Sequence, residues 1–191
     1  MITKLKYGNT NTYFISGLLI DTDYAGTLPA FYKEIKRNNI SATDIKYVLA
    51  THYHPDHMGL IGELTELGVK LLLTEHQLGY VHFSDEIFRR EPRLNYKPID
   101  ESKALVIACE ESRDILRDTG IQGEIIPTKS HSSDGIAVIF DDGNCFVGDL
   151  EPFEFIGAYE NNTALREDWE LILSYAPAVI HYGHANKKIM R

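Results

Sequence analysis

The segment Thr51–His57, with the sequence THYHPDH, places three of the chain's eight histidines within six residues. It follows Ile45–Ala50, an almost continuously apolar stretch that predicts a strand covered on both faces. In an extended loop the side chains of residues i and i+2 point the same way, so His52 and His54 can reach one metal ion together. This pattern restricts the chain to folds that present a metal site at the end of a strand.

The rest of this segment suits a second metal ion. Pro55 bends the chain and can direct Asp56 and His57 towards that ion. Imidazole and carboxylate ligands suit zinc, and also iron or manganese. Two metal ions need more ligands than one loop supplies, so we expect other parts of the chain to contribute.

Three further ligand candidates each follow a short apolar stretch that reads as a strand. Because α/β folds collect functional side chains at strand ends, we expect these residues to meet in space although they are distant in sequence. His181 lies three residues before the last of them and is the alternative ligand there. The three candidates are His131, Asp149 and His184.

The predicted strands fall into two groups with helices interspersed in each half, which indicates two packed sheets with helices outside. Between them, residues 74–99 combine aromatic side chains with a dense run of charges. We interpret this segment as a helix plus loop inserted between strands, and as a candidate lid. The helices are predicted over residues 29–38, 59–67, 112–118 and 169–175.

The order of these motifs resembles the metallo-β-lactamase superfamily over nearly the full chain. The resembling features are the strand–turn–strand of residues 11–21 with its continuation to Asp23, the HxHxDH motif, His131, and the Gly-Asp and Gly-His pairs ending at Asp149 and His184. The resemblance implies an α/β fold of the four-layer αββα sandwich type, formed by residues 1–191 as one domain. A glycine precedes the ligand in this family, which favours His184 over His181.

The resemblance also implies how the ligands are shared and what they do. The first metal takes His52, His54 and His131, the second takes Asp56, His57 and His184, and Asp149 bridges the two. We expect two divalent ions, zinc first and iron or manganese as alternatives, that hold a hydroxide between them. That hydroxide would cleave a small ester, thioester, amide or phosphodiester, with Asp56 holding it in line as the catalytic residue.

Two other functions stay open at this point. A mononuclear iron dioxygenase acting on a persulfide or a related small thiol can retain the same motif and use His52, His131 and Asp149 as ligands. A non-catalytic binding scaffold is the second alternative, although no ligand position is lost. Metal analysis separates the first alternative from a hydrolase, and an activity panel separates the second.

Composition and net charge limit the kinds of partner that this chain is expected to bind. The net charge of −9, with only short basic clusters at residues 89–90 and 187–188, argues against a nucleic-acid partner. A small net positive charge at the metals favours a small anionic substrate. No signal peptide or membrane span is expected, and Cys109 and Cys145 are interpreted as buried free thiols in a reducing cytoplasm. The oligomeric state is not predicted.

Overall fold

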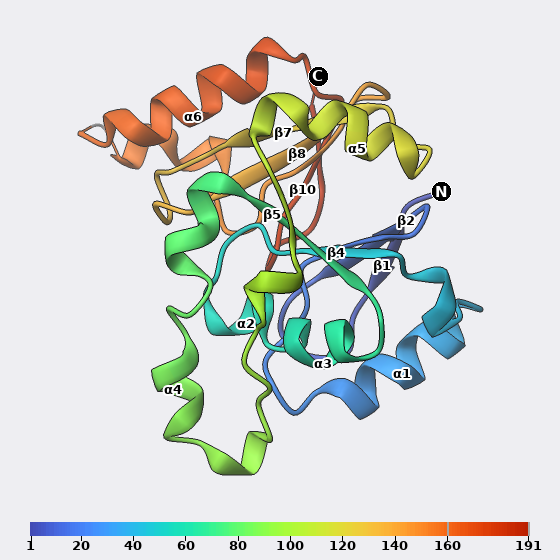
Figure 1. The fold of residues 1–191 in the computed structure, drawn as a ribbon. Coiled ribbons are helices and arrows are strands. Elements are labelled where there is room, and N and C mark those ends of the chain that lie inside the picture. Colours follow the sequence, from blue (N-terminus) through green and yellow to red (C-terminus); the bar gives the residue numbers. More distant parts are fainter. Residues whose placement is uncertain (160, 191) are drawn as a thin grey trace. The chain divides into compact units, whose positions relative to one another are not determined.

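The computed structural model describes residues 1–159 and 161–190, and the chain divides into two compact units. We call Met1–Ala108 unit 1 and Cys109–Arg191 unit 2. Each unit contains one sheet and its own helices (Figure 1). The two groups of strands predicted from the sequence are therefore present, one in each unit.

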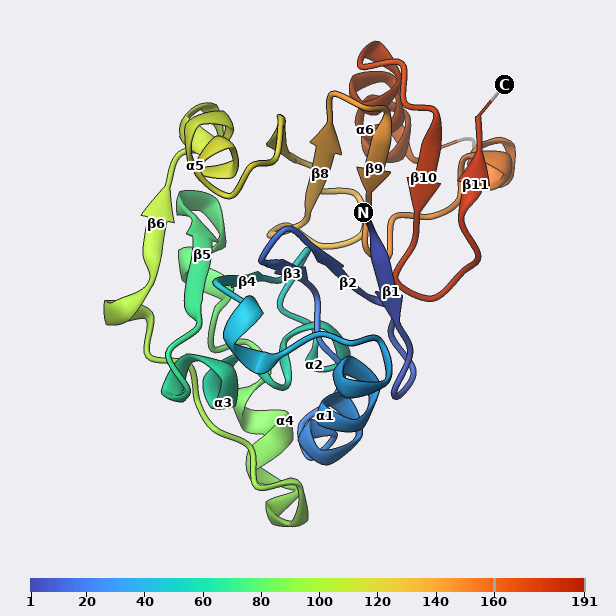
Figure 2. The same ribbon diagram turned by 90° about the vertical axis from the view of Figure 1, so that its right-hand side faces the viewer.

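Unit 1 is built on a six-stranded sheet whose strands follow one another in sequence order, as Figure 2 shows. The first three strands are antiparallel, and the strands from the third to the sixth run parallel. The carboxyl ends of the parallel strands therefore lie at one edge of the sheet. The strands are β1 (Thr3–Leu5), β2 (Thr12–Ile15), β3 (Leu18–Ile20), β4 (Tyr47–Leu49), β5 (Lys70–Thr74) and β6 (Leu105–Ile107).

Two helices of unit 1 bury apolar side chains in its core. In α1 (Leu28–Arg37) Phe31 and Ile35 are buried one turn apart, Pro29 occupies the first turn, and the last turn is basic. Together with α3 (Ile61–Glu66) this helix contributes to the core of the unit. The remaining helical elements are η1 (Ala42–Asp44), α2 (Pro55–Met58), η2 (Glu75–Tyr80), α4 (Asp85–Arg89), η3 (Pro92–Leu94) and η4 (Glu101–Lys103), where η denotes a 3₁₀ helix.

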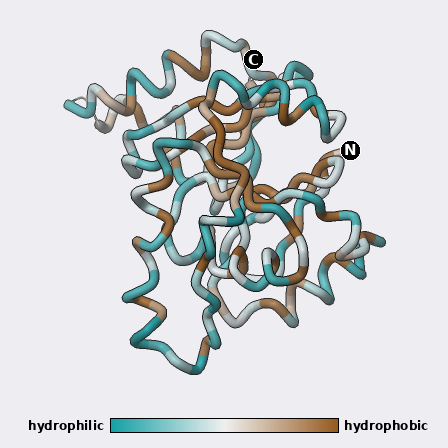
Figure 3. The backbone as a smooth tube through the Cα atoms, viewed as in Figure 1, coloured by the Kyte–Doolittle hydropathy of each residue, from teal (hydrophilic) through white to brown (hydrophobic). Residues whose placement is uncertain are grey.

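Unit 2 is built on a five-stranded sheet in the order β11-β10-β9-β8-β7. Helix α6 (Thr163–Ser174) packs on it through Leu165, Trp169 and Ile172, and Figure 3 shows hydrophobic and hydrophilic positions alternating along this helix. The strands are β7 (Gly123–Pro127), β8 (Ile136–Phe140), β9 (Asn144–Phe146), β10 (Val179–His181) and β11 (Lys188–Ile189). The other helical elements are η5 (Cys109–Glu111), α5 (Ser112–Asp118) and η6 (Phe153–Tyr159).

Two predictions about local structure were incomplete. Helix α6 begins at Thr163 rather than at Trp169, because the Asn162 side chain accepts a hydrogen bond from the Leu165 N–H and caps a polar first turn. The short strands β1 and β11 were not predicted, because their sequences, TKL and KI, contain no apolar run. The segment 74–99 is helical and irregular as predicted, and its role as a lid remains a prediction.

The two cysteines differ in their environment. Neither of them forms a disulfide within the described residues, and only Cys145 is buried, so the prediction that both are buried is wrong for Cys109. Strand β6 ends at Ile107, and Cys109 opens the helix η5 at the surface instead of continuing the apolar strand. Among the described residues, no helix is long and apolar enough to cross a membrane.

Candidate metal centre

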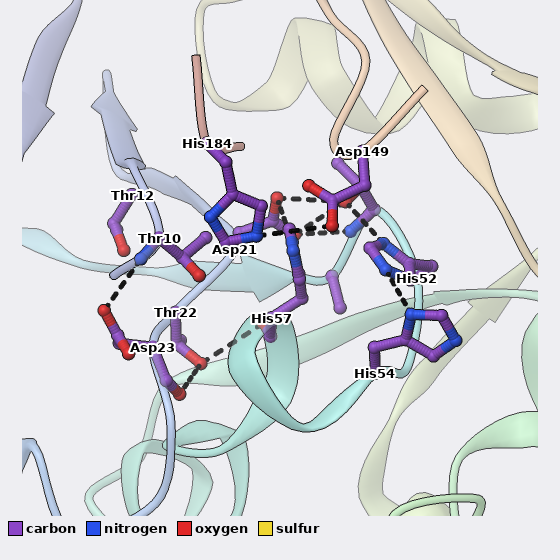
Figure 4. Close-up of polar contacts among 12 residues, drawn as sticks. Thr10, Thr12, Asp21, Thr22, Asp23, His52, His54, His57, Asp149 and His184 are labelled. Atoms are coloured by element: carbon purple, nitrogen blue, oxygen red, sulfur yellow. Dashed lines mark hydrogen bonds and ion pairs between the residues drawn. The ribbon is translucent and has the colours of Figure 1, made fainter. Parts of the chain in front are cut away.

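The loop after β4 brings the first predicted ligands together in unit 1. His52 Nε2 lies 3.0 Å from His54 Nδ1, and the ring centroid of His57 lies 4.1 Å from that of His52 (Figure 4). His52 is buried and His54 is half-buried. The prediction that residues i and i+2 of this loop point the same way is confirmed.

The second half of the loop is a helical turn rather than an irregular bend. Helix α2 begins at Pro55, which occupies its first turn, and it ends at Met58. Asp56 lies partly exposed in the first turn, and His57 is fully buried one residue later. The bend expected at Pro55 is therefore present as the start of a helical turn, and the second metal ion that Asp56 and His57 would bind stays a prediction.

A buried aspartate that sequence analysis did not assign to the site holds His57 in place. Asp21 follows β3 with a left-handed backbone (φ 58°), and its Oδ2 lies 3.0 Å from His57 Nδ1. Its carboxylate also accepts hydrogen bonds from the backbone N–H of Thr51, at 2.6 Å, and from the Thr51 hydroxyl. With Nδ1 carrying the proton, His57 keeps Nε2 available as a metal ligand.

Thr22, the residue after Asp21, also anchors the metal-ligand loop through hydrogen bonds. The Thr22 N–H donates to the carbonyl of His57 at 2.9 Å, and the Thr22 hydroxyl bonds to that carbonyl as well. Asp23 accepts from the backbone N–H of Thr10 instead (Figure 4). A carboxylate directly after a buried strand was the available signal for Asp21, and it was interpreted only as the end of the strand–turn–strand.

Unit 2 brings the other three predicted ligands together. Asp149 Oδ2 lies 3.3 Å from His184 Nε2 and 4.0 Å from His131 Nε2. The three side chains are between 18% and 33% exposed, so they are reachable from solvent. They line a cavity of about 240 Å³ together with Tyr182, whose pKa is raised to about 12 by burial.

Backbone hydrogen bonds fix the loops that carry these three side chains. The Gly183 N–H donates to the carbonyl of Gly148 at 2.7 Å, which joins the residues preceding His184 and Asp149. Gly148 has a positive φ of 57°, a conformation that favours glycine at this turn. The two glycines of the Gly-Asp and Gly-His pairs therefore have a direct structural role.

A second carboxylate absent from the sequence-based site positions the loop before His131. Asp168, on α6, accepts the backbone N–H groups of Lys129 at 3.2 Å and Ser130 at 2.8 Å. Nothing in the local sequence around Asp168 connects it with residues almost forty positions earlier. Its contribution to positioning His131 becomes visible only once α6 is packed on the sheet.

The structure distinguishes the two histidines at the end of β10. His181 Nε2 lies 2.8 Å from the Asn144 side-chain oxygen, and its ring stacks on Phe146 at 4.6 Å. His181 therefore contributes to the packing between β9 and β10, while His184 lies beside Asp149. This geometry favours His184 as the ligand, in agreement with the glycine that precedes it.

The chemistry of both clusters fits a transition metal. Two nitrogen ligands of one tetrahedral zinc ion, each about 2.0–2.1 Å from it, are separated by roughly 3.3 Å. The nitrogen pair of unit 1 is 3.0 Å apart, and the oxygen and nitrogen pairs of unit 2 are 3.3 and 4.0 Å apart. The His52–His54 and Asp149–His184 pairs are therefore close to the separation of two ligands of one metal ion, and the Asp149–His131 pair is wider.

Comparison with known proteins shows which family profile the chain matches and which curated proteins are similar to it. The profile of the Metallo-beta-lactamase superfamily matches residues 5–184. The lactamase-like protein aptB of Emericella nidulans is 25% identical over 183 residues, covering 90% of this chain and 51% of that protein. The atrochrysone carboxyl ACP thioesterase of Aspergillus fumigatus is 27% identical, covering 73% of this chain and 29% of that protein. The chain thus spans about half or less of the length of these relatives.

Solved structures share the fold. A metallo-beta-lactamase family protein of Thermus thermophilus, TTHA1429, superposes with a TM-score of 0.71 at 18% identity, over 98% of this chain and 73% of that one. TTHA1623 in a di-iron-bound form gives 0.69 at 22% identity, over 99% and 94%. The α/β fold of the metallo-β-lactamase type that the sequence predicted is confirmed.

Proposed function

The chain belongs to the Metallo-beta-lactamase superfamily, and on that premise we propose that it is a hydrolase that uses two divalent metal ions to cleave a thioester. The observation that carries the proposal is the donor geometry of the two clusters. In unit 1 two imidazole nitrogens lie 3.0 Å apart, and in unit 2 a carboxylate oxygen lies 3.3 and 4.0 Å from two imidazole nitrogens.

We assign the ligands as the family pattern implies. One ion would be held by His52, His54 and His131, and the other by Asp56, His57 and His184. Asp149 would be a ligand shared by both ions. This assignment requires the clusters of unit 1 and unit 2 to serve the same pair of ions. Zinc fits the imidazole-rich set, and iron fits it as well.

The protein side chains have separate tasks in this proposal. Two bound divalent ions supply a Lewis acid for the carbonyl oxygen and lower the pKa of a water molecule towards neutrality. Asp56, partly exposed in the first turn of α2, accepts a hydrogen bond from the attacking water and holds it in line. Asp21 keeps Nδ1 of His57 protonated, so that the histidine orientation does not change during turnover.

A thioester is the proposed substrate because of the curated relatives. Among them, the Aspergillus fumigatus protein is named as an ACP thioesterase. In the hydrolysis a carbon–oxygen bond from water forms, the carbon–sulfur bond breaks, and the thiolate leaves and takes up a proton. No oxidant or reductant is consumed. Esters, amides and phosphodiesters remain the alternatives for the same site.

Metal analysis and a substrate panel test the proposal together. Protein purified without added metal should contain about two metal ions per chain, and it should hydrolyse model thioesters faster than matched phosphodiesters. Asp149→Ala should abolish that hydrolysis, and Asp142→Ala, at an exposed turn of unit 2, is the matched control. About one iron per chain with persulfide-dependent oxygen uptake would instead establish the dioxygenase. Metal binding without turnover of any substrate would indicate the binding scaffold.

A further inference from the structure

Phe83 is an exposed aromatic residue held beside the metal-ligand loop. Its ring centroid lies 5.9 Å from that of His54, and the side chain is 59% exposed. A phenylalanine at the surface gives up the favourable burial that a core position offers. An exposed ring next to a predicted metal ligand therefore calls for a local explanation.

The backbone around Phe83 is fixed by its buried neighbours. Val81 and Ser84 are both fully buried, and the Ser84 hydroxyl donates to the carbonyl of Tyr53 at 2.6 Å. Tyr53 lies between His52 and His54, so this bond fastens the segment to the metal-ligand loop itself. The Phe83 N–H also donates to the carbonyl of Tyr80 at 2.8 Å.

The segment that leads to Phe83 is fastened at its beginning as well. It leaves β5, which runs parallel to β4, so it starts at the same sheet edge as the metal-ligand loop. The buried Gln77 side chain donates to the carbonyl of Ala50, the residue just before that loop. These hydrogen bonds hold the backbone at Phe83 next to the metal-ligand loop, and the Phe83 ring lies beside His54.

We propose that Phe83 forms the apolar wall of the substrate site and selects thioesters whose acyl group carries an aromatic ring or another flat apolar group. This inference rests on the proposed function and names its substrate class. A flat acyl group that packs on the Phe83 ring would place its carbonyl next to the ligand His54. Acetyl, which has too little surface to cover the ring, would gain little from the contact.

The test compares two thioesters of the same thiol, N-acetylcysteamine, carrying either a phenylacetyl or an acetyl group. The wild-type protein should prefer the phenylacetyl thioester. Phe83→Ala should lower kcat/KM for that substrate about tenfold and change the acetyl thioester less than about twofold. Phe83→Trp, which retains a ring, should restore most of the preference. Leu67→Ala, which removes a 61% exposed apolar side chain elsewhere in unit 1, is the matched control and should change neither value.

Two further measurements distinguish a role of Phe83 in substrate binding from an effect on metal content or folding. The zinc content and melting temperature of Phe83→Ala should equal those of the wild type, because the ring is 59% exposed and a phenyl ring has no hydrogen-bonding group whose loss would leave a partner unsatisfied. Titration calorimetry with phenylacetate and acetate measures the affinity of the site for each carboxylate, and it does not depend on turnover. Wild-type protein should bind phenylacetate about tenfold more tightly, and Phe83→Ala should lose that difference.

The results separate failure of this inference from failure of the proposed function. If neither thioester is hydrolysed, the thioesterase proposal fails, and the calorimetry alone decides whether Phe83 is an apolar wall. If Phe83→Ala lowers both substrates equally, or lowers neither, Phe83 does not select the acyl group. Equal binding of the two carboxylates by the wild-type protein would overturn the inference as well.

Discussion

Replacing Asp21 by asparagine should weaken metal binding by a path that the structure specifies. The amide would keep the size of the side chain but would turn one carboxylate oxygen into an N–H₂ donor. If the amide nitrogen takes the place of Oδ1, it faces the backbone N–H of Thr51. If it takes the place of Oδ2, it faces Nδ1 of His57. Either the Thr51 bond is lost, or His57 moves its proton to Nε2, the nitrogen assigned to the metal.

The magnitude follows from the burial of these groups. Asp21 is only 1% exposed, and a buried donor without its acceptor costs about 1–3 kcal/mol. For a chain of this size that corresponds to a fall in melting temperature of roughly 2–12 °C. Loss of an outer partner of a metal-ligating histidine lowers metal affinity by about 10- to 100-fold. We expect both effects in Asp21→Asn.

Zinc competition with a chromophoric chelator measures the affinity, and thermal unfolding of the metal-free protein measures the stability. Asp23→Asn is the matched control. Asp23 is buried two residues away and accepts backbone N–H groups from Thr10 and Tyr24, with no histidine among those partners. It should lose stability and keep its zinc affinity within about threefold. Wild-type zinc affinity in Asp21→Asn, or an equal loss in Asp23→Asn, would refute the reasoning.

Three other substitutions or probes test separate parts of the account. Asp56→Ala should lower turnover about 100-fold or more while the melting temperature falls by less than about 3 °C, because Asp56 is partly exposed; a collapse of stability with turnover unaffected would contradict this. Hydrogen bonds to Glu101 and to a second neighbouring carboxylate raise the pKa of His82. Protonated His82 should therefore stabilise the folded protein fully below the ordinary histidine pKa, and this contribution should decline as the pH rises through the raised pKa. Melting curves of His82→Gln should therefore approach those of the wild type as the pH rises above the ordinary histidine pKa, and a constant difference would exclude the effect. A thiol reagent should modify Cys109 in the native protein and reach Cys145 only after unfolding, because burial raises the pKa of the Cys145 thiol; rapid modification of both would show that the β9 region opens.

Sequence reasoning succeeded where the signal is local. The loop His52–His57 carries its chemistry in consecutive residues, and the i and i+2 geometry of the extended chain already orients His52 and His54. Asp149 and His184 each follow a short, mostly apolar strand and are directly preceded by a glycine, so the sequence indicated their positions at strand ends of unit 2 as well. Those features depend on neighbours in the chain, which a sequence displays directly.

The supporting residues were missed because their partners are distant in sequence. Asp21 acts on His57, and Asp168 acts on the backbone of residues 129 and 130. Both are isolated carboxylates without a spacing pattern, and only the packing of strands and helices reveals their partners. Phe83 was part of a segment interpreted as a lid, and its position beside His54 depends on buried hydrogen bonds that local sequence does not encode.

The central claim is that the ligands of both units bind one pair of metal ions. Anomalous X-ray diffraction from crystals of the zinc-loaded protein tests it most directly. The account predicts two zinc peaks roughly 3.5–4 Å apart, with His52, His54 and His131 around one and Asp149 touching both. A single peak, or peaks whose ligands come from one unit alone, would contradict the account.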